Sequence, residues 1–415
     1  MSANLCPPRR MVWISALPAL FSLSSLASAQ NLTVQLGDSN PLRLGSIIPE
    51  AQDFDLSTRG KFKGAVILGT QADVVYNSNF FMTENDEQDE TTAVLTPWIK
   101  YISDPEGGAE ASLEANYRPA FLFFHDNSDL NNVNQAGDIT LKLKGSRTEI
   151  TAYGWYEEVA GSDRLTGTYV EGGLFTGGIR GVRQIAPRTQ LHSKITAAVT
   201  QYTSGGAVGA QVYTANLGAL WLSSERLSFG PTVGYSRSES DNTGSTNAWS
   251  LLLDARYQLG ERIWLTASFG PEFSLSSGVA GGADSTNVDL SADLRMKYLI
   301  NERWIWQNTI RSATVPAPSD TNYLVNDIAV ITELQRTLLR GWISGGLEYH
   351  LSGYQDVGTT TTNRGDENNV SVYLTYQRNL IPDRAYFNTT VRYSSNDGLV
   401  DWSQWMLSAG FNMAF

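Results

Sequence analysis

The stretch VDLSADLRMKY, residues 288–298, alternates apolar and polar side chains at every position. Successive side chains of a β-strand point to opposite faces, so this stretch predicts a strand with one apolar face and one face that carries all of its charges. The same alternation recurs from Phe62 onward, for example in residues 113–118, 263–270 and 370–377. The sequence therefore predicts an all-β protein built from many similar strands.

The connections between these segments differ in length in a regular way, because eight short connections alternate with nine longer polar ones. The short connections are predicted at Ser103–Gly107, Gly145–Arg147, Ala186–Arg188, Ser223–Arg226, Leu259–Arg262, Ile300–Arg303, Thr337–Gly341 and Asn379–Arg384. The longer connections are predicted at Asn77–Glu90, His125–Val133, Val159–Arg164, Ser204–Gly209, Glu239–Thr246, Ser277–Ser285, Pro316–Asn322, Gly353–Glu367 and Asn396–Asp401. Short periplasmic turns that alternate with longer outside loops are typical of outer-membrane barrels.

Nine loops and eight turns require eighteen antiparallel strands, so residues 62–415 are predicted to form a transmembrane up-and-down β-barrel. The connections around Gly145, Gly161 and Gly181 are the least distinct, which leaves sixteen strands as the second count. A soluble sandwich would also alternate, and a solenoid or propeller would also repeat at hairpin length. None of these architectures explains the alternation of short and long connections.

Two segments precede the predicted barrel. Residues 1–29 are expected to be a secretory signal peptide, because two arginines precede an apolar stretch that ends in Ala27-Ser28-Ala29, a small-x-small cleavage motif. Residues 30–61 contain two prolines and do not alternate, so we expect a periplasmic N-terminal extension, with a short plug as the alternative. The expected location is the bacterial outer membrane, after export through the inner membrane.

Composition argues against several function classes. The formal net charge of −12 does not fit a nucleic-acid binder, which needs basic patches, and three His and one Cys leave too few ligands for a Cys/His metal centre. We expect no cofactor and no metal. The acidic run Glu84–Glu90 lacks the spacing of a calcium loop and is expected to be solvated. His125, His192 and His350 have no nucleophile elbow or paired acids beside them, so we expect no enzymatic activity.

The C-terminus ends in an alternating strand whose last residue is aromatic. Ser408, Gly410, Met413 and Phe415 are similar to the outer-membrane assembly signal, which has a polar residue, a glycine, an apolar residue and a terminal aromatic at these spacings. A terminal strand can add to the edge of an assembly machine by main-chain pairing. The sequence therefore predicts two partners, the barrel assembly machinery and outer-membrane lipid.

The polar faces of the predicted strands carry charges that would line the lumen. The candidates are Lys100, Arg118, Lys142, Lys144, Lys194, Asp254, Arg256, Glu272, Asp293, Arg295, Lys297, Arg311, Glu333, Glu348 and Arg392. Strand direction places mostly cationic side chains near the short turns and mostly acidic ones near the loops. We expect this axial asymmetry to favour entry of anions from the turn side. The alternative is that these charges pair with one another and only add rigidity.

The first predicted hairpins resemble a family of β-barrel porins associated with exopolysaccharide gene clusters. The likeness lies in residues 74–80 (VVYNSNF), the acidic loop that follows, Leu95-Thr96-Pro97 and Leu113–Tyr117. It implies an outer-membrane channel for polysaccharide or small solutes and brings no catalytic residues. The second hypothesis is a barrel with a closed lumen that serves as a structural, adhesive or secretion-complex partner.

Overall fold

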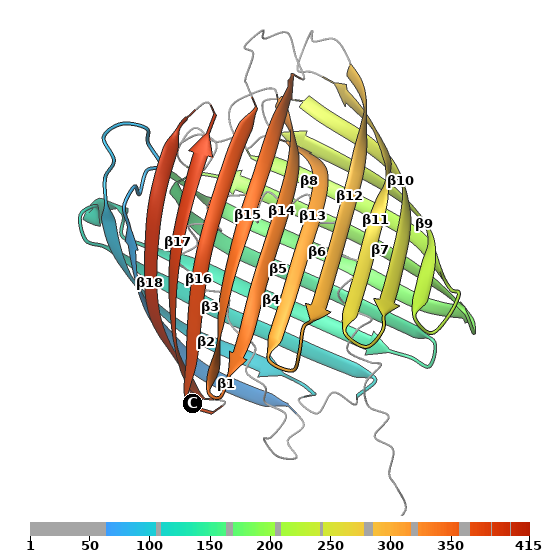
Figure 1. Ribbon diagram of the computed structural model, residues 1–415, viewed down its shortest axis with the longest axis horizontal. Coiled ribbons are helices and arrows are strands. Elements are labelled where there is room, and N and C mark those ends of the chain that lie inside the picture. Colours follow the sequence, from blue (N-terminus) through green and yellow to red (C-terminus); the bar gives the residue numbers. More distant parts are fainter. Residues whose placement is uncertain are drawn as a thin grey trace, which may run out of the picture.

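The computed structural model describes residues 64–104, 109–162, 169–203, 209–240, 244–277, 285–316, 323–356, 366–382, 384–398 and 400–415. The predicted signal peptide and N-terminal extension lie outside these ranges. The described residues form long strands and one turn of 3-10 helix, η2 (Ser128–Leu130) (Figure 1). The strands are β1 (Ala65–Asn77), β2 (Glu90–Ile102), β3 (Ala111–Phe124), β4 (Asn132–Lys144), β5 (Thr148–Ser162), β6 (Tyr169–Ala186), β7 (Thr189–Tyr202), β8 (Ala210–Leu222), β9 (Leu227–Ser240), β10 (Gly244–Leu259), β11 (Ile263–Ser277), β12 (Ser285–Leu299), β13 (Trp304–Pro316), β14 (Tyr323–Leu338), β15 (Gly341–Asp356), β16 (Glu367–Ile381), β17 (Ala385–Asp397) and β18 (Trp402–Ala414).

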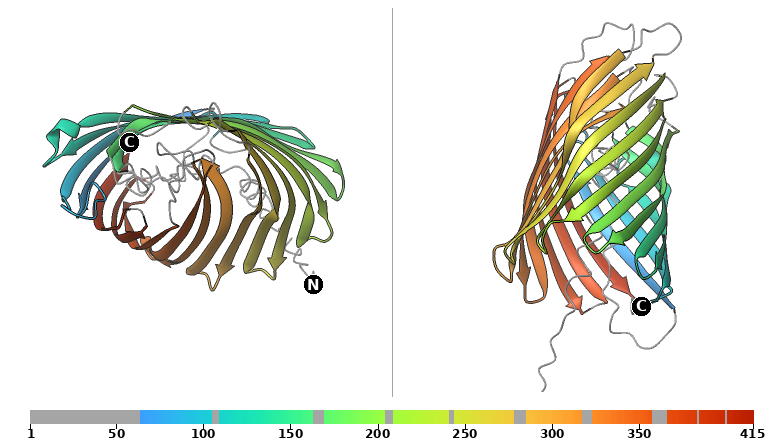
Figure 2. Two further views of the ribbon diagram at one scale, coloured as in Figure 1. Left: turned by 90° about the horizontal axis from the view of Figure 1, so that it is seen from above. Right: turned by 90° about the vertical axis from the view of Figure 1, so that its right-hand side faces the viewer.

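The strands form one closed antiparallel sheet. Each strand pairs with the next strand in the chain, and β1 pairs with β18 from Gly69↔Ala414 to Asn77↔Met406. The strands are strongly inclined to the barrel axis, and the barrel is wider in one direction than in the other when seen from above (Figure 2). This closure confirms the predicted eighteen-strand barrel and shows that the count of sixteen is wrong.

Most of the observed connections follow the predicted alternation, with short turns at one end, here called the turn side, and longer loops at the other, the loop side. Two depart from it, because β2 ends at Ile102 and β3 begins only at Ala111 on the turn side, whereas β9 ends at Ser240 and β10 begins at Gly244 on the loop side. Several boundaries differ by a few residues. β5 continues to Ser162 and β15 to Asp356, beyond the predicted loop starts at Val159 and Gly353. Main-chain pairs continue past the alternating apolar residues there, up to Ser162↔Tyr169 and Tyr323↔Asp356. Side-chain alternation marks the membrane-spanning part of a strand, whereas hydrogen bonding sets its full length.

The barrel has an apolar outer face and a polar inner face. On β12, for example, Val288 and Leu290 are 63% and 64% exposed, whereas Asp293 on the opposite face is 5% exposed. Along β10 the outer face is apolar from Trp249 to Tyr257, roughly 26 Å at about 3.3 Å per residue. Leu259, two residues further on the same face, is also apolar and exposed, which brings the length to roughly 33 Å. At a strand tilt of about 40° this length rises about 25 Å along the barrel axis, which matches the apolar band of a membrane-spanning barrel. The outer surface is therefore that of a transmembrane protein.

Six outward-facing tyrosines mark the loop-side border of this band. Each hydroxyl donates a hydrogen bond to a polar side chain that lies nearer the loops. The pairs are Tyr76 with Asp89, Tyr117 with Gln135, Tyr156 with Glu158, Tyr213 with Gln211, Tyr235 with Asn247 and Tyr349 with Asn368. Tyrosine rings prefer the membrane–water interface, with the ring in the apolar region and the hydroxyl toward water. We call these pairs the tyrosine rim.

The described residues contain no helix that is long and apolar enough to cross a membrane.

Candidate channel lumen and outer mouth

All fifteen charged side chains that the sequence proposes for the lumen lie on the inner face of the barrel. They alternate along their strands with the exposed apolar side chains of the outer face. Their neighbours on the inner face are mostly polar, including Thr196, Thr214 and Ser268. The inner wall is thus rich in hydroxyl, amide and charged groups, as expected of a surface that contacts water or polar solutes.

Several of these charges form ion pairs within the wall. Lys100 Nζ lies 2.7 Å from Glu114 Oε1. Arg295 donates two hydrogen bonds to Asp293, from Nε at 2.8 Å and from Nη2 at 2.7 Å. A bidentate pair of this kind has no net charge and restricts both side chains.

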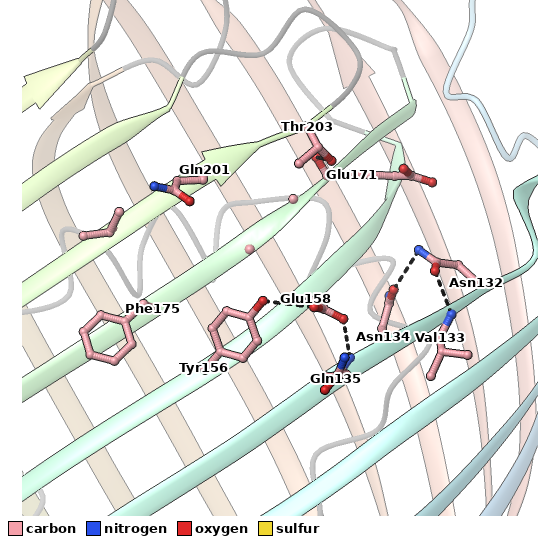
Figure 3. Close-up of a pocket in the computed structure, with 13 residues that line it drawn as sticks. Asn132, Val133, Asn134, Gln135, Tyr156, Glu158, Glu171, Phe175, Gln201 and Thr203 are labelled. Carbon is pink, nitrogen blue, oxygen red and sulfur yellow. Dashed lines mark hydrogen bonds between the residues drawn. The ribbon is translucent and has the colours of Figure 1, made fainter.

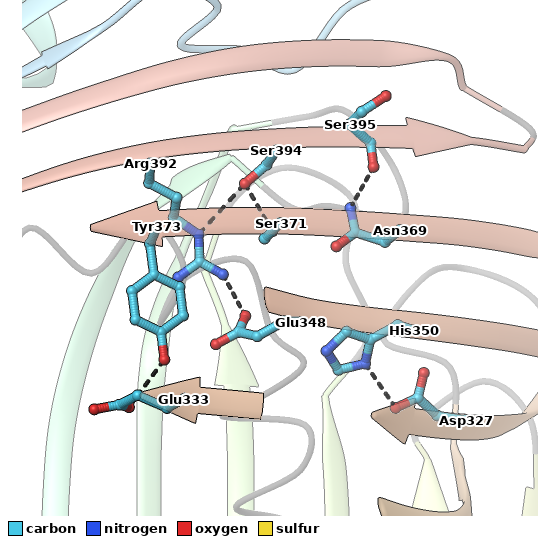
Figure 4. Close-up of polar contacts among 10 residues, drawn as sticks. All are labelled: Asp327, Glu333, Glu348, His350, Asn369, Ser371, Tyr373, Arg392, Ser394 and Ser395. Carbon is cyan, nitrogen blue, oxygen red and sulfur yellow. Dashed lines mark hydrogen bonds and ion pairs between the residues drawn. The ribbon is translucent and has the colours of Figure 1, made fainter. Parts of the chain in front are cut away.

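A larger polar network covers the inner faces of β14–β17 (Figure 4). Arg392 forms an ion pair with Glu348, and its guanidinium group lies 5.7 Å from the centre of the Tyr373 ring. The Tyr373 hydroxyl donates to Glu333 at 2.9 Å. In the same wall, His350 Nδ1 lies 3.1 Å from Asp327. The candidates Glu333, Glu348 and Arg392 therefore belong to one connected network.

Glycines on the inner face let long side chains reach past the neighbouring strand. The His192 side chain on β7 crosses Gly218 on β8 and meets Thr232 on β9 at 3.0 Å. Thr232 in turn donates to Asp254 on β10 at 2.5 Å. A Cβ at position 218 would collide with both His192 and Thr232. The same arrangement places Tyr373 over Gly346 on its way to Glu333. We call these positions glycine windows.

Three lysines differ from the paired charges. Among the described residues, Lys142, Lys144 and Lys297 form no ion pair. All three lie within a few residues of short turns, because β4 ends at Lys144 and β12 at Leu299. Among the described residues Arg118, Arg256 and Glu272 also form no ion pair. The three lysines are set apart from Arg118 and Glu272 by their place next to the short turns.

The loop between β1 and β2 folds against the inside of the barrel mouth. Phe80 is buried in a cluster with Val94, Leu122 and Phe124, which are inner-face residues of β2 and β3. The Phe80 ring also lies 5.9 Å from the Tyr169 ring at the start of β6. The cluster is one of several apolar clusters that interrupt the polar inner face. The cluster holds the base of the loop inside the barrel mouth. The sequence predicts only the length of this loop and not its contact with the inner face.

Asn79 fastens the same loop to β18. Its side-chain amide donates to the carbonyl oxygens of Thr83 and Ser403, at 2.8 and 3.1 Å, and Gln404 donates to its main-chain oxygen at 2.7 Å. Asn79 is fully buried. The loop is therefore held on both sides, by polar contacts to β18 and by apolar contacts to β3 and β6.

Glu90 corrects one sequence prediction. The acidic residues from Glu84 to Asp89 are exposed, as expected of a solvated loop, but Glu90 is 1% exposed. Its carboxylate accepts main-chain hydrogen bonds from His125, Asp126 and Asn127, and a fourth from the Asn127 amide at 2.7 Å. Glu90 therefore fixes the start of the β3–β4 loop, because it accepts hydrogen bonds from three successive main-chain N–H groups of that loop.

The predicted assembly signal occupies the closing strand. Ser408 and Gly410 face inward, whereas Met413 and Phe415 lie on the outer face. A Cβ at Gly410 would collide with the Asp73 side chain of β1, so this glycine allows β18 to lie against β1. The main-chain nitrogen of Phe415 donates to Leu68 at 2.8 Å, and its ring is 61% exposed. Assembly itself stays a prediction.

The chain is similar to several solved structures but matches no protein family. No family model and no curated protein matches the chain. The chain is similar to outer membrane protein OpdK of Pseudomonas aeruginosa, with 13% identity, a TM-score of 0.47, and coverage of 85% of this chain and 99% of that one. It is similar to OccAB3 of Acinetobacter baumannii, with 10% identity, a TM-score of 0.45, and coverage of 84% and 99%. It is also similar to the FrpB iron transporter of Neisseria meningitidis, with 8% identity, a TM-score of 0.47, and coverage of 84% and 64%. These likenesses are too remote to carry an argument about function, which has to come from the barrel's own lumen.

Proposed function

We propose that this protein is a porin-like channel of the bacterial outer membrane that favours anionic solutes entering from the turn side. The observation that carries the proposal is the group of three lysines without ion pairs at that end of the inner wall. An eighteen-strand barrel is wide enough for an aqueous channel. Charges near its mouth attract oppositely charged solutes through their summed field.

The paired charges refine this proposal. Arg295 belongs to a bidentate pair with Asp293, so it contributes little net field to the lumen. Lys142, Lys144 and Lys297 therefore carry the proposed selectivity. The exposed acidic residues of the β1–β2 loop oppose them at the other end. The solutes are anionic small molecules or segments of an acidic polysaccharide, which enter from the cationic end and meet a barrier to return.

The test is conductance of the purified full-length protein in planar lipid bilayers. The wild type is expected to conduct, to rectify current and to prefer anions. The triple variant Lys142→Gln/Lys144→Gln/Lys297→Gln should shift the reversal potential toward cation selectivity and lose rectification. Both changes should be larger at low salt, because the screening length is about 10 Å at 0.1 M and about 30 Å at 0.01 M.

A matched control is the double variant Asp293→Asn/Arg295→Gln, which removes two charged groups but no net charge. Its selectivity should stay close to that of the wild type. An unchanged reversal potential in the triple variant would contradict the proposed role of the lysines. A barrel that inserts into the bilayer without conducting would instead support the closed-lumen hypothesis, with the Phe80 cluster as the first contact to examine.

A further inference from the structure

A groove of about 640 Å³ lies on the outside of the barrel, near the loop-side ends of β4–β7 (Figure 3). Its size is within the range of pockets that hold small-molecule ligands. The residues that line it are Asn132, Val133, Asn134, Gln135, Tyr156, Glu158, Glu171, Gly172, Gly173, Phe175, Val199, Gln201 and Thr203. Most of these side chains alternate with inner-face residues and so point away from the lumen.

The groove exists because β4 and β5 diverge at this end. Their pairing stops at Ala136↔Glu157, so residues 132–135 pair with β3 alone and residues 158–162 with β6 alone. The Glu158 carboxylate spans the gap by accepting the Gln135 main-chain N–H at 2.9 Å. Gly173 opposite Glu158 has no side chain to fill the space above the sheet. The result is the groove in the outer wall, with Glu158 and the Gln135 main chain as a pre-formed polar edge.

The groove is closed on the side that faces the lumen. Val170 and Leu174 of β6 are buried on the inner face, where they pack with Trp155 and Tyr202. Asn134 is also buried. The groove is therefore a site on the membrane-facing surface rather than a side opening of the channel.

The tyrosine rim sets the height of the groove relative to the membrane. Tyr156 belongs to the rim and donates to Glu158 at 3.0 Å, so the groove begins at the interface and extends above it. Below it on the same outer face lie exposed apolar side chains such as Ile139, Ile179 and Ile195. A ligand in the groove would thus sit at headgroup level with an apolar surface directly beneath it.

The lining of the groove favours one kind of headgroup. The outward-facing side chains Gln135, Gln201, Thr203, Glu158 and Glu171 offer several hydrogen-bond donors and acceptors within one space. Two aromatic rings in the lining, one of tyrosine and one of phenylalanine, add faces that can pack on the C–H groups of a sugar ring. The described lining residues include two carboxylates and no lysine or arginine, which disfavours a phosphate in the groove itself.

We propose that this groove binds the sugar headgroup of a membrane glycolipid, with its hydroxyl groups on Gln135, Glu158, Glu171 and Gln201 and its acyl chains on the apolar band below. The outer leaflet of an outer membrane is rich in glycolipid, and the predicted topology places the loop side at that leaflet. The inference does not depend on solute passage, because the groove is on the opposite side of the wall from the lumen.

The experiment measures glycolipid bound to the full-length barrel in phosphatidylcholine nanodiscs, by native mass spectrometry during titration with rough lipopolysaccharide, which consists of lipid A and core sugars. Gly173→Trp should fill the groove and reduce affinity at least tenfold. A second variant, Glu158→Gln/Glu171→Gln/Gln201→Ala, should also reduce it, while the amide introduced at position 158 can still accept the Gln135 N–H. The matched control is Gln211→Ala/Asn247→Ala, which changes the tyrosine rim outside the groove and should bind like the wild type.

Two further probes distinguish the sources of binding. Phosphatidylglycerol, which has a phosphate and no sugar ring, should not compete, and core oligosaccharide without acyl chains should compete weakly. The proposal is overturned if both groove variants bind as the wild type does, if phosphatidylglycerol competes fully, or if the free oligosaccharide binds as tightly as the glycolipid. Binding that disappears on chelation of divalent cations would also overturn it, because an ion bridge to phosphate would then explain the contact.

Discussion

His192, Thr232 and Asp254 form a chain of contacts that only a glycine at position 218 permits. The three side chains come from β7, β9 and β10, so the contact passes over β8 without touching a side chain of that strand. Buried polar groups cost free energy when they lack partners. The glycine window therefore stabilises the wall by letting these groups find one another.

We predict that Gly218→Ala destabilises the barrel by about 1 to 3 kcal/mol, the usual cost of overpacking, because the added methyl group must displace His192 or Thr232. The measurement is the unfolding midpoint temperature from SDS gel electrophoresis of heated samples, in which the folded barrel migrates faster than the unfolded chain. The control is Gly154→Ala, whose Cβ would lie at an ordinary 3.5 Å from Ile139. Equal midpoints for the two variants would show that position 218 tolerates a side chain.

At the scale of a single element, the β1–β2 loop is anchored by buried side chains. Phe80 packs inside the mouth and Asn79 bonds to β18. Loops that carry buried contacts of this kind hold a defined position, whereas loops with only exposed polar residues do not.

Phe80→Ala is expected to release the base of this loop, because loss of a buried aromatic ring costs about 3 to 5 kcal/mol. Single-channel recordings should show a larger and noisier conductance than the wild type. The control is Phe123→Ala, since Phe123 lies at the same end of the barrel but is 52% exposed on the outer face. A conductance unchanged by Phe80→Ala would mean that the loop does not narrow the mouth.

A second element-scale prediction concerns β18. Deletion of Phe415 should leave exported protein that does not assemble, because the terminal aromatic completes the outer face of the strand that the assembly machinery would recognise. Protease sensitivity of the membrane fraction checks this. Phe411→Leu, an outer-face change in the same strand, should assemble normally. Full barrel yield after the deletion would remove Phe415 from the signal.

The sequence predicts the elements better than their contacts. Period-two alternation identifies the two faces, and link lengths give the strand count, because both depend on local sequence. Glu90 illustrates the limit, since nothing in the acidic run distinguishes it from Glu87, and only the fold brings the His125–Asn127 amides to its carboxylate. Phe80 and His192 are similar cases, because their partners come from strands distant in the chain.

For the whole molecule, the topology is a testable prediction. With eighteen strands, the start of β1 at Ala65 and the end of β18 at Ala414 lie on the turn side, which we predict faces the periplasm. A peptide tag inserted near Glu87, at the exposed tip of the β1–β2 loop, should be labelled on intact cells. A tag near Glu302, in the turn between β12 and β13, should be labelled only after the membrane is opened. Labelling of Glu302 on intact cells would reverse the assigned orientation.

Because β1 pairs with β18, the barrel can close only after β18 has been synthesised. Gly69 and Ala414 are neighbours in the sheet although almost the whole barrel sequence separates them, so the partner of the first strand is the last one made. A chain released early would have two open edges whose unpaired N–H and C=O groups the bilayer cannot solvate. Such a fragment has no stable place in the membrane and stays available to periplasmic proteases. Closure of the ring therefore depends on β18, the strand that pairs with β1.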